Sequence, residues 1–467
     1  MIARKSALIL ATQTANGILG YVGIFLVARY MAMPDYMLGV VSFAYGLVAI
    51  FDVFNNLGFH QAHIKRVSGG QDLETCMGTF AAVKIALTGL MALLLVGGML
   101  IWTHVIGRGF ESPEHESAVY VMLVYFVLWS LTQIIRTTFM AKKQMAKEQL
   151  PMFFETLARV AATVYVVWAG LGALALAWTY VVGEIAVFAT ALFFFRGYPI
   201  GRPSWEMFKS YASFAMPVAV VVASTRIMTN VDKVLIQLFW GAAEGGDYFS
   251  IYRLSRFLDQ ATLAMGILLF PTISAMHARR DMDGIKKLSY TAERYLSMVM
   301  FPLAFGIIFL AEPAVHILLS DKFFTAVPIL QILPLFALLD ALERPYQMKL
   351  MGINLPHFTR NRVLIMVAMN VGLNVLLIPK DIRILGLDLF GMGAMGAAIA
   401  TVIAYAAGLI YTRWVVWRVS GMTVNWRILL HGIAATVMGF MLYYLNELVY
   451  PVARWYGLLG YGLLGLG

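Results

Sequence analysis

Long apolar runs follow one another along almost the whole chain and are separated by short polar segments. A window of about 19 residues places these runs near residues 7–31, 38–60, 76–102, 117–141, 150–170, 172–195, 212–239, 247–276, 295–319, 324–350, 361–379, 390–417 and 426–448. A bilayer-spanning helix needs about 20 mostly apolar residues, so each run is long enough to cross a membrane. A last run, residues 456–467, is too short to cross, and we expect either part of a fourteenth span or a segment at the interface. The pattern predicts an all-α polytopic membrane protein with 12–14 transmembrane helices.

Composition agrees with this pattern and excludes a soluble enzyme. Of the 467 residues, 61% are hydrophobic and only 13% are charged, whereas soluble domains are about 45–50% apolar and about 25% charged. The single cysteine, Cys76, excludes disulfides and cysteine-based metal sites. The longest inner polar segment, His277–Arg294, is too short for a catalytic domain, and we expect an amphipathic helix along the membrane surface there. No Walker A motif is present, so we expect a transporter that has neither cofactor nor metal and is not an ATPase.

The basic residues predict which side of the membrane each loop faces. The formal net charge is +10 and the chain holds 35 lysines and arginines. If the N-terminus is cytoplasmic, 21 of them lie in inner segments, 5 in outer segments and 9 within spans. An excess of lysine and arginine on the cytoplasmic side is the usual topology signal of membrane proteins. We therefore predict a multi-pass protein of the cell inner (plasma) membrane with a cytoplasmic N-terminus, and nucleic acid is not an expected partner.

An internal repeat divides the predicted spans into two halves. Two segments about 209 residues apart each combine the end of an apolar span, a very short turn with small and acidic residues, and an aromatic-rich span start. They read VARYMAMPDYMLGVVSFAYGL, from Val27, and IQLFWGAAEGGDYFSIYRLSR, from Ile236. Internal duplication is typical of secondary transporters, whose substrate sites lie between the two halves. We predict two six-helix lobes, residues 1–203 and 204–420, around a central cavity, with residues 421–467 adding span thirteen and a partial span fourteen.

Sixteen charged side chains fall inside the predicted spans, although each costs roughly 2.5–3.5 kcal/mol at the bilayer centre on insertion scales. The cations are Arg29, Lys84, Arg136, Arg159, Arg226, Lys233, Arg253, Arg256 and Arg344, and the acids are Asp52, Glu155, Glu184, Asp232, Asp259, Asp340 and Glu343. Helical spacing predicts that three pairs share a helix face, namely Glu155 with Arg159, Arg256 with Asp259 and Asp340 with Arg344. Two further cations, Arg136 and Lys233, lie near span ends, where long side chains reach the interface.

The charges that remain without a local partner point to an anion. They are Arg29, Lys84, Arg226 and Arg253 among the cations and Asp52, Glu184, Asp232 and Glu343 among the acids. Pairing between helices, such as Arg226 with Glu184, is the alternative explanation and stays open. The unpaired arginines lie on spans one, seven and eight, the repeat elements at which the two halves would meet. Arginine offers planar, bidentate donors that stay charged at any pH, so phosphate or pyrophosphate is the leading candidate ligand.

The turn residues resemble a family of transporters. Ala28-Arg29-Tyr30 followed by Met33-Pro34-Asp35-Tyr36 resembles the "R-x-L-G-P-E-x-x-G" ending of the first helix in polysaccharide-transporter flippases of the multidrug/oligosaccharidyl-lipid/polysaccharide exporter superfamily. Met37 stands where that family has glycine, and Gly39 is a candidate substitute. The "D-x-x-x-I-G…Y-x-x-A-x-R" stretch of the family is similar to the segment from Asn230 through Asp232, Ile236, Gly241 and Tyr248 to Arg253.

The resemblance implies two six-helix lobes, alternating access and a substrate. That substrate is an isoprenoid (pyro)phosphate-linked oligosaccharide, moved from the inner to the outer leaflet for cell-surface polysaccharide assembly. The resemblance also implies a monomer whose partners are membrane lipid and glycosyltransferases or a polymerase of the same pathway. The rival interpretations are a cation-coupled multidrug or toxin extruder of the same superfamily and a membrane glycan polymerase or ligase.

Each candidate site residue receives a role in this hypothesis. We expect Arg29, Arg226, Arg253 and Arg256 to hold the pyrophosphate. We expect Gln13, Asn16 and Asn230 to donate and accept hydrogen bonds with the sugars. The acids that are candidates for carrying a coupling ion or proton are Asp52, Glu184 and Asp259.

Overall fold

The computed structural model describes residues 2–105, 107, 109–256, 258–382, 386–448, 451–452 and 454–466. Within these ranges it describes side chains except those of residues 2–10, 259–261, 263–268, 382, 455, 459 and 463–466. The described chain divides into two compact units, residues 1–246 and 247–467. The two lobes predicted from the repeat, with their boundary after residue 203, stay a prediction.

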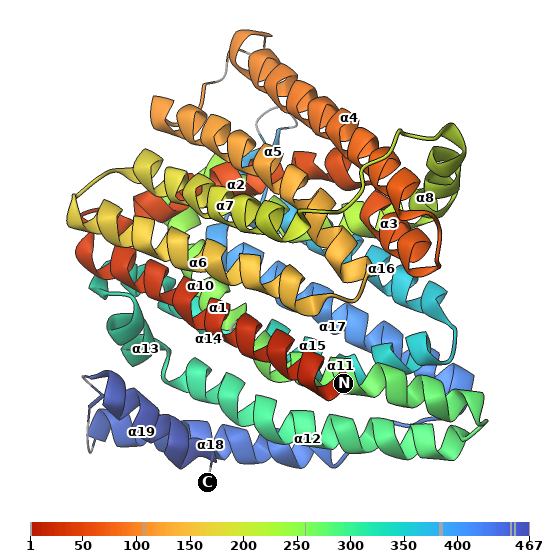
Figure 1. Cartoon of the computed structure of the whole chain (residues 1–467). Helices are drawn as coiled ribbons and strands as arrows, with labels where there is room; N and C mark the ends of the chain where they lie inside the picture. The colour runs from red at the N-terminus through yellow and green to blue at the C-terminus, as the bar shows by residue number, and fades with distance from the viewer. Residues whose placement is uncertain are drawn as a thin grey trace. The chain divides into compact units, whose positions relative to one another are not determined.

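The first unit is a bundle of helices (Figure 1). Its helices are α1 (Ile2–Tyr30), α2 (Pro34–Asn56), α3 (Phe59–Ser68), α4 (Leu73–Leu100), the π-helical turn η1 (Ile101–Val105), α5 (Pro113–Ala141), α6 (Met145–Trp168), α7 (Ala173–Phe195), α8 (Trp205–Met228), α9 (Val231–Trp240) and the start of α10 (Ala242–Arg256). Helix α2 is central because it packs against α4, α5, α7, α8 and α9, and 72% of its membrane-spanning window is buried.

The second unit is also helical. After the rest of α10 come α11 (Asp259–Ala278), α12 (Met282–Phe309), α13 (Ala311–Leu318), the 3-10 helix η2 (Asp321–Ala326), α14 (Val327–Ile332), α15 (Pro334–Gly352), α16 (Pro356–Leu377), α17 (Gly393–Ser420), α18 (Ile428–Leu448) and α19 (Trp455–Leu466). A short antiparallel hairpin between α16 and α17 pairs β1 (Asp381–Ile382) with β2 (Leu387–Asp388). The core of this unit forms where α12, α15, α16, α17 and α18 pack together.

Twelve helical segments within the described ranges are long and apolar enough to cross a membrane. This count and the helical content confirm the predicted all-α polytopic fold. Helix α19, with 12 residues, is too short to cross, as expected. The internal repeat and the central cavity stay predictions.

Two predicted segments differ from the structure. The eighth span, predicted over residues 247–276, is divided between α10, which ends at Arg256, and α11, which begins at Asp259. Arg253 and Arg256 lie in the last turn of α10, where cations complement the helix dipole and favour a helix end. The surface helix predicted over 277–294 is also wrong, because residues from Met282 onward form the first turns of the continuous spanning helix α12.

Helix α3 is held in the first unit by a buried histidine. His63 Nδ1 lies 2.8 Å from the Tyr211 hydroxyl, and its Nε2 lies 3.0 Å from the Thr138 hydroxyl. Burial, with a smaller contribution from His60, lowers the pKa of His63 to about 3. The imidazole is therefore neutral at physiological pH and serves as a structural hydrogen-bonding group that joins α3, α5 and α8.

Two glycines allow the starts of α2 and α10 to cross at backbone contact. A Cβ atom on Gly39 would lie 1.7 Å from the Ala242 carbonyl oxygen, and one on Gly246 would lie 1.8 Å from the Asp35 carbonyl oxygen. Neither position has room for a side chain unless the helices move apart. The crossing therefore depends on glycine at both positions.

We expect Gly39→Ala to lower the free energy of unfolding by about 2 kcal/mol, because overpacking a close contact forces a backbone shift. Gly97→Ala on α4 is the matched control, since nothing lies within 4 Å of its new methyl group. The control should gain up to about 1 kcal/mol from the higher helix propensity of alanine. Thermal unfolding of the two purified variants in detergent measures the difference, and equal melting temperatures would contradict the close crossing.

Candidate functional site

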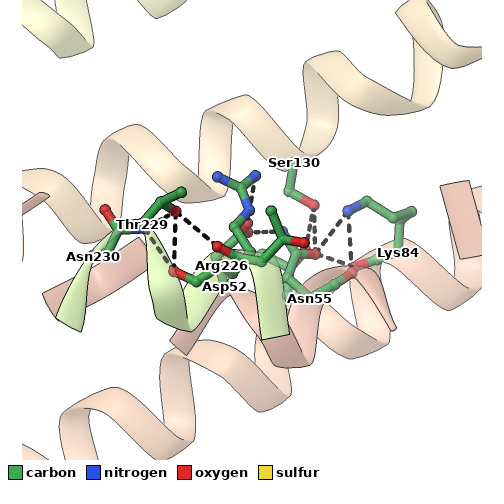
Figure 2. Close-up of polar contacts among 9 residues, drawn as sticks. Asp52, Asn55, Lys84, Ser130, Arg226, Thr229 and Asn230 are labelled. Carbon is green, nitrogen blue, oxygen red and sulfur yellow. Dashed lines mark hydrogen bonds and ion pairs between the residues drawn. The ribbon is translucent and has the colours of Figure 1, made fainter. Parts of the chain in front are cut away.

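The candidate site lies where the central helix α2 meets a break in a membrane span. Helices α8 and α9 together form one candidate span, Trp205–Trp240, but Thr229 and Asn230 interrupt it as a turn. Membrane transporters commonly build substrate and ion sites at such discontinuous helices, because the break frees backbone groups inside the membrane. The polar side chains of α2, α4, α5 and α8 converge beside this break (Figure 2).

An ion pair between Asp52 on α2 and Arg226 on α8 is the centre of the site. Arg226 Nη2 lies 3.1 Å from Asp52 Oδ2. The Asp52 side chain is fully buried, whereas 27% of the Arg226 side chain is exposed. The guanidinium carbon also lies 5.3 Å from the ring centre of Trp129 on α5. Arg226 is therefore anchored on one side and accessible on another.

Asn55, one turn after Asp52, connects this ion pair to a buried lysine. The Asn55 side-chain amide donates to Asp52 Oδ1 at 2.8 Å. Its Oδ1 accepts from Lys84 Nζ on α4 at 2.9 Å and from the Ser130 hydroxyl on α5 at 2.9 Å. Lys84 also donates to the Asn55 backbone carbonyl at 3.2 Å. One amide side chain therefore satisfies polar groups from three helices.

The break between α8 and α9 is stabilised by side chains that satisfy the freed backbone groups. Asn230 Nδ2 donates to the Arg226 carbonyl at 2.9 Å. Lys233 Nζ donates to the Thr229 carbonyl at 2.9 Å and to Asn230 Oδ1 at 2.9 Å. A Cβ on Gly46 of α2 would lie 3.2 Å from Lys233 Cβ, so the glycine brings α2 close to this turn. The Lys233 ammonium group therefore caps the broken helix, and its predicted place at the interface stays a prediction.

The charges around Arg226 are suited to an anion. Arg226 on α8 and Lys84 on α4 bring two basic groups to the single carboxylate of Asp52, and both helices pack against α2. Burying ionised groups is costly unless they are paired, so excess positive charge favours a bound anion. Among the described residues, no group of three or more histidines, cysteines and acids is arranged to hold a metal ion.

The structure resolves the question of the Arg226 partner left open by the sequence. Arg226 pairs with Asp52, not with Glu184. Glu184 lies on α7 with only 2% of its surface exposed, and its Oε1 has no hydrogen-bond partner among the described residues. The neighbouring Glu155 and Arg159 form the predicted intrahelical pair, with 3.0 Å between Arg159 Nε and Glu155 Oε1.

Three predicted site residues, Gln13, Asn16 and Arg29, lie on α1. Gln13 and Asn16 are half-buried, and Asn16 Oδ1 is buried without a hydrogen-bond partner among the described residues. Arg29 is exposed, and its guanidinium carbon lies 6.0 Å from the Phe25 ring centre. Of the predicted site residues, the structure brings Asp52, Arg226 and Asn230 together.

The remaining predicted residues belong to the second unit. Arg253 is half-buried and its guanidinium carbon lies 5.3 Å from the Phe249 ring centre. Arg256 is exposed and lies 5.9 Å from the Tyr252 ring centre. The Asp259 side chain lies outside the described residues, so its predicted pairing with Arg256 stays a prediction.

The sequence did not predict two charge clusters of the second unit. Their arginines, Arg362 and Arg413, lie beside predicted cytoplasmic loops and were therefore counted among the residues outside the spans. Glu343 on α15, expected to lack a partner, accepts from Arg362 Nη2 on α16 at 2.6 Å. Asp340 pairs with Arg344 as predicted, at 2.5 Å, and also faces Arg362. In the other cluster, Glu293 on α12 pairs with Arg413 on α17 and accepts from the Tyr346 hydroxyl at 2.6 Å.

Similar pairing holds Arg136 in the first unit. Its Nη2 lies 2.7 Å from Glu148 Oε1 on α6, and its predicted place at the interface stays a prediction. Partners on another helix have no fixed sequence spacing, which is why these pairs could not be found from i, i+4 patterns. Within α2 a signal did exist, because Asp52 and Asn55 are three residues apart and share a helix face.

The fold is that of a class of membrane transporters. The chain superposes on a structure of the lipid II flippase MurJ in an inward closed conformation with a TM-score of 0.75 and 15% identity, covering 98% of this chain and 97% of that one. An inward-facing multidrug resistance MATE family transporter of the MOP superfamily gives a TM-score of 0.65 at 15% identity, covering 88% and 96%. A MOP superfamily transporter from Pyrococcus furiosus gives 0.59 at 15% identity, covering 90% and 96%.

The family is identified from the sequence. The family model described as "Polysaccharide biosynthesis protein" matches residues 26–328, which is more than half of the chain. The protein therefore belongs to the polysaccharide biosynthesis protein family. An uncharacterized membrane protein of Methanocaldococcus jannaschii is 27% identical over 216 residues, which cover 45% of this chain and only 40% of that relative. Family, fold and candidate spans together support a multi-pass membrane protein of the polysaccharide biosynthesis family with a fold that is also found in membrane transporters.

We expect Asn55→Ala to lower the free energy of unfolding by about 3 kcal/mol. It leaves the buried Lys84 ammonium and the hydroxyls of Thr88 and Ser130 without the Asn55 Oδ1 acceptor. Adding Lys84→Met should recover part of this loss, since the orphaned charge is then removed. Asn56→Ala is the matched control, because Asn56 Oδ1 has no hydrogen-bond partner among the described residues. Chemical unfolding in detergent measures the three variants, and equal losses at positions 55 and 56 would contradict the role of Asn55.

Proposed function

We propose that the protein is a flippase that moves an isoprenoid (pyro)phosphate-linked oligosaccharide from the inner to the outer leaflet by alternating access, for assembly of cell-surface polysaccharide. The observation that carries this proposal is Arg226 beside a broken membrane helix. Its side chain is 27% exposed, pairs with the carboxylate of Asp52, and has a second basic group, Lys84, on the other side of that carboxylate. The family and the fold are consistent with it. An organic cation would be repelled at this site, which argues against a multidrug extruder.

In this proposal the phosphate oxygens bind the accessible side of Arg226. Guanidinium donors form charge-assisted hydrogen bonds with phosphate, and these are roughly twice as strong as bonds between neutral groups. Asn230 lies one turn from Arg226 and is proposed as a ligand of the first sugar, which it could reach only by giving up its bonds to the Arg226 carbonyl and to Lys233. Arg29, Arg253 and Arg256 are proposed as further pyrophosphate ligands, and Gln13 and Asn16 as further sugar ligands.

The Asp52–Arg226 ion pair suggests how transport could be coupled to protons. Asp52 and the substrate phosphate compete for the same guanidinium. Protonating Asp52 removes its charge and frees Arg226 for the anion, whereas deprotonation draws Arg226 back and releases the anion. The groups facing Asp52 are Arg226, Asn55 and Lys84. Glu184 and Asp259 are the alternative carriers of a coupling proton or ion.

Location and partners complete the proposal. We place the protein in the plasma membrane as a monomer with a cytoplasmic N-terminus, with lobes over residues 1–203 and 204–420 and an added segment over 421–467. Glycosyltransferases or a polymerase of the same pathway would supply and consume the lipid-linked glycan.

Arg226→Ala should reduce flipping of a fluorescent lipid-pyrophosphate oligosaccharide in proteoliposomes by at least about tenfold, because it removes charge-assisted bonds worth about 1.5–3 kcal/mol each. Arg226→Lys keeps the charge without the bidentate geometry and should retain partial activity. The same alanine variant should fail to complement a flippase-deficient strain at normal expression.

Arg196→Ala is the control, because Arg196 is exposed and stacks on Phe193. Melting temperatures separate loss of transport from loss of folding. Full flipping by a folded Arg226→Ala variant would overturn the assignment. Faster export of organic cations by that variant would favour the multidrug alternative.

Asp52→Asn should make the affinity for lipid pyrophosphate independent of pH between about pH 5 and pH 8, since asparagine carries neither the charge nor the proton. In the unmodified protein, affinity should rise as pH falls, because protonated Asp52 no longer competes for Arg226. A diphosphate esterified at both ends has lost its acidic protons well below pH 5, so the substrate charge is constant over this range and the pH response reports on the protein. An unchanged pH response in Asp52→Asn that disappears in Glu184→Gln would assign the proton to Glu184.

A further inference from the structure

A cavity opens at the end of the first unit that the charge asymmetry predicts to face outward. It has a volume of about 500 Å³ and lies where α2 and α5 begin and α4 and α9 end. Its wall includes Phe43, Trp102, Phe110, Glu111, His115 and Gln237. A cavity of this size, largely apolar with a few convergent polar groups, is typical of small-ligand sites.

The polar part of the wall is held in place by a hydrogen-bonded cluster. Glu111 Oε2 accepts from the Ala242 backbone N–H at 3.0 Å and from the Gln237 side-chain amide. His115 Nε2 lies 3.6 Å from the same carboxylate oxygen, and its Nδ1 lies 2.9 Å from the Ser112 hydroxyl. The Glu111 side chain nevertheless remains 44% exposed. An anchored carboxylate that is still accessible is a preorganised acceptor for hydroxyl groups.

The aromatic part of the wall supplies flat apolar faces. Phe43 contacts both Phe110 and His115, with 6.0 Å between ring centroids in each case, and Trp102 lies on the η1 turn beside them. Sugar rings combine an apolar C–H face with hydroxyls at their edge, so they fit a wall that joins aromatic faces to acceptors. Among the described residues that line this cavity there is neither lysine nor arginine, the side chains that select phosphate.

An apolar chamber adjoins this cavity along α2 and α4. It has a volume of about 210 Å³, shares the walls formed by Phe43, Trp102 and Phe110, and continues to Phe51 on α2 and Leu95 on α4. Phe51 lies eight residues after Phe43, which is about 12 Å farther along the helix. Together the two chambers form one site with a polar end at Glu111 and an apolar end at Phe51, which suits a ligand that is itself polar at one end and apolar at the other.

We propose that these chambers form a binding site for an amphiphile with an uncharged sugar headgroup and an alkyl or isoprenyl chain. The sugar stacks on Trp102 and Phe110 and donates hydroxyl hydrogen bonds to Glu111, while the chain extends toward Phe51 and Leu95. This site goes beyond the proposed transport site, from which it differs in its residues and its preferred charge. It does not depend on flipping activity.

Three probes with the same chain test the headgroup: hexyl β-glucoside, hexyltrimethylammonium and hexyl phosphate. Binding to the full chain in lipid nanodiscs is followed by saturation-transfer NMR. We expect hexyl β-glucoside to bind most tightly and to receive saturation on its ring protons. Trp102→Ala and Glu111→Gln should each weaken this binding about fivefold to tenfold, through loss of the aromatic face and of the charged acceptor. Phe51→Ala should weaken binding of hexyl but not of methyl β-glucoside.

Trp414→Ala is the matched control for partition onto exposed aromatic surface, because Trp414 is 47% exposed on α17 of the second unit. Trp102→Phe should restore most of the affinity lost in Trp102→Ala, which excludes a general folding defect. Tighter binding of hexyltrimethylammonium, or unchanged glucoside binding in both Trp102→Ala and Glu111→Gln, would overturn the proposal. Arg226→Ala should leave glucoside binding unchanged, so this site and the transport site can fail independently.

Discussion

The cost of placing charge inside a membrane is the constraint on which this structure depends. Asp52 and Lys84 are almost completely buried, and Arg226 is mostly buried, yet each has a specific partner. Asn55 makes this possible, because its amide group donates to Asp52 while its oxygen accepts from Lys84 and Ser130. If the Asn55 acceptor were lost, buried donors on α4 and α5 would lack a hydrogen-bond partner. The packing of α4, α5 and α8 around α2 is therefore coupled to one small polar network.

In the second unit, buried charges are compensated in a different way, by equal numbers of acids and cations. There, Asp340 and Glu343 face Arg344 and Arg362, so two acids are matched by two cations. Glu293 and Arg413 form another matched pair. These clusters join α12, α15, α16 and α17 and are electrically balanced. Around Asp52 the basic groups exceed the acids, and this difference between balanced and unbalanced clusters distinguishes structural ion pairs from a candidate anion site.

The broken span adds a second property to the unbalanced cluster. Because α8 ends at Met228 and α9 begins at Val231, the backbone carbonyls near Arg226 are freed from helical hydrogen bonds. Lys233 and Asn230 satisfy them. If Arg226 moves toward a ligand, the backbone that must adjust is therefore this turn, which side-chain hydrogen bonds hold, and not a continuous helix. A turn of this kind rearranges with less loss of backbone hydrogen bonding than a helix interior.

The apolar runs by themselves determined that the protein is an all-α polytopic membrane protein, because burial in lipid leaves helices as the simplest way to satisfy the backbone. Spacing along one helix also predicted the pairs Glu155–Arg159 and Asp340–Arg344 correctly. Only the tertiary structure decided that Arg226 pairs with Asp52 and Glu343 with Arg362, because those partners lie on different helices and no sequence interval encodes them. It also decided that residues 247–276 are two helices and that Lys233 caps a helix break. Sequence reports the hydrophobic surface that each segment must bury, whereas charge pairing depends on which helices become neighbours.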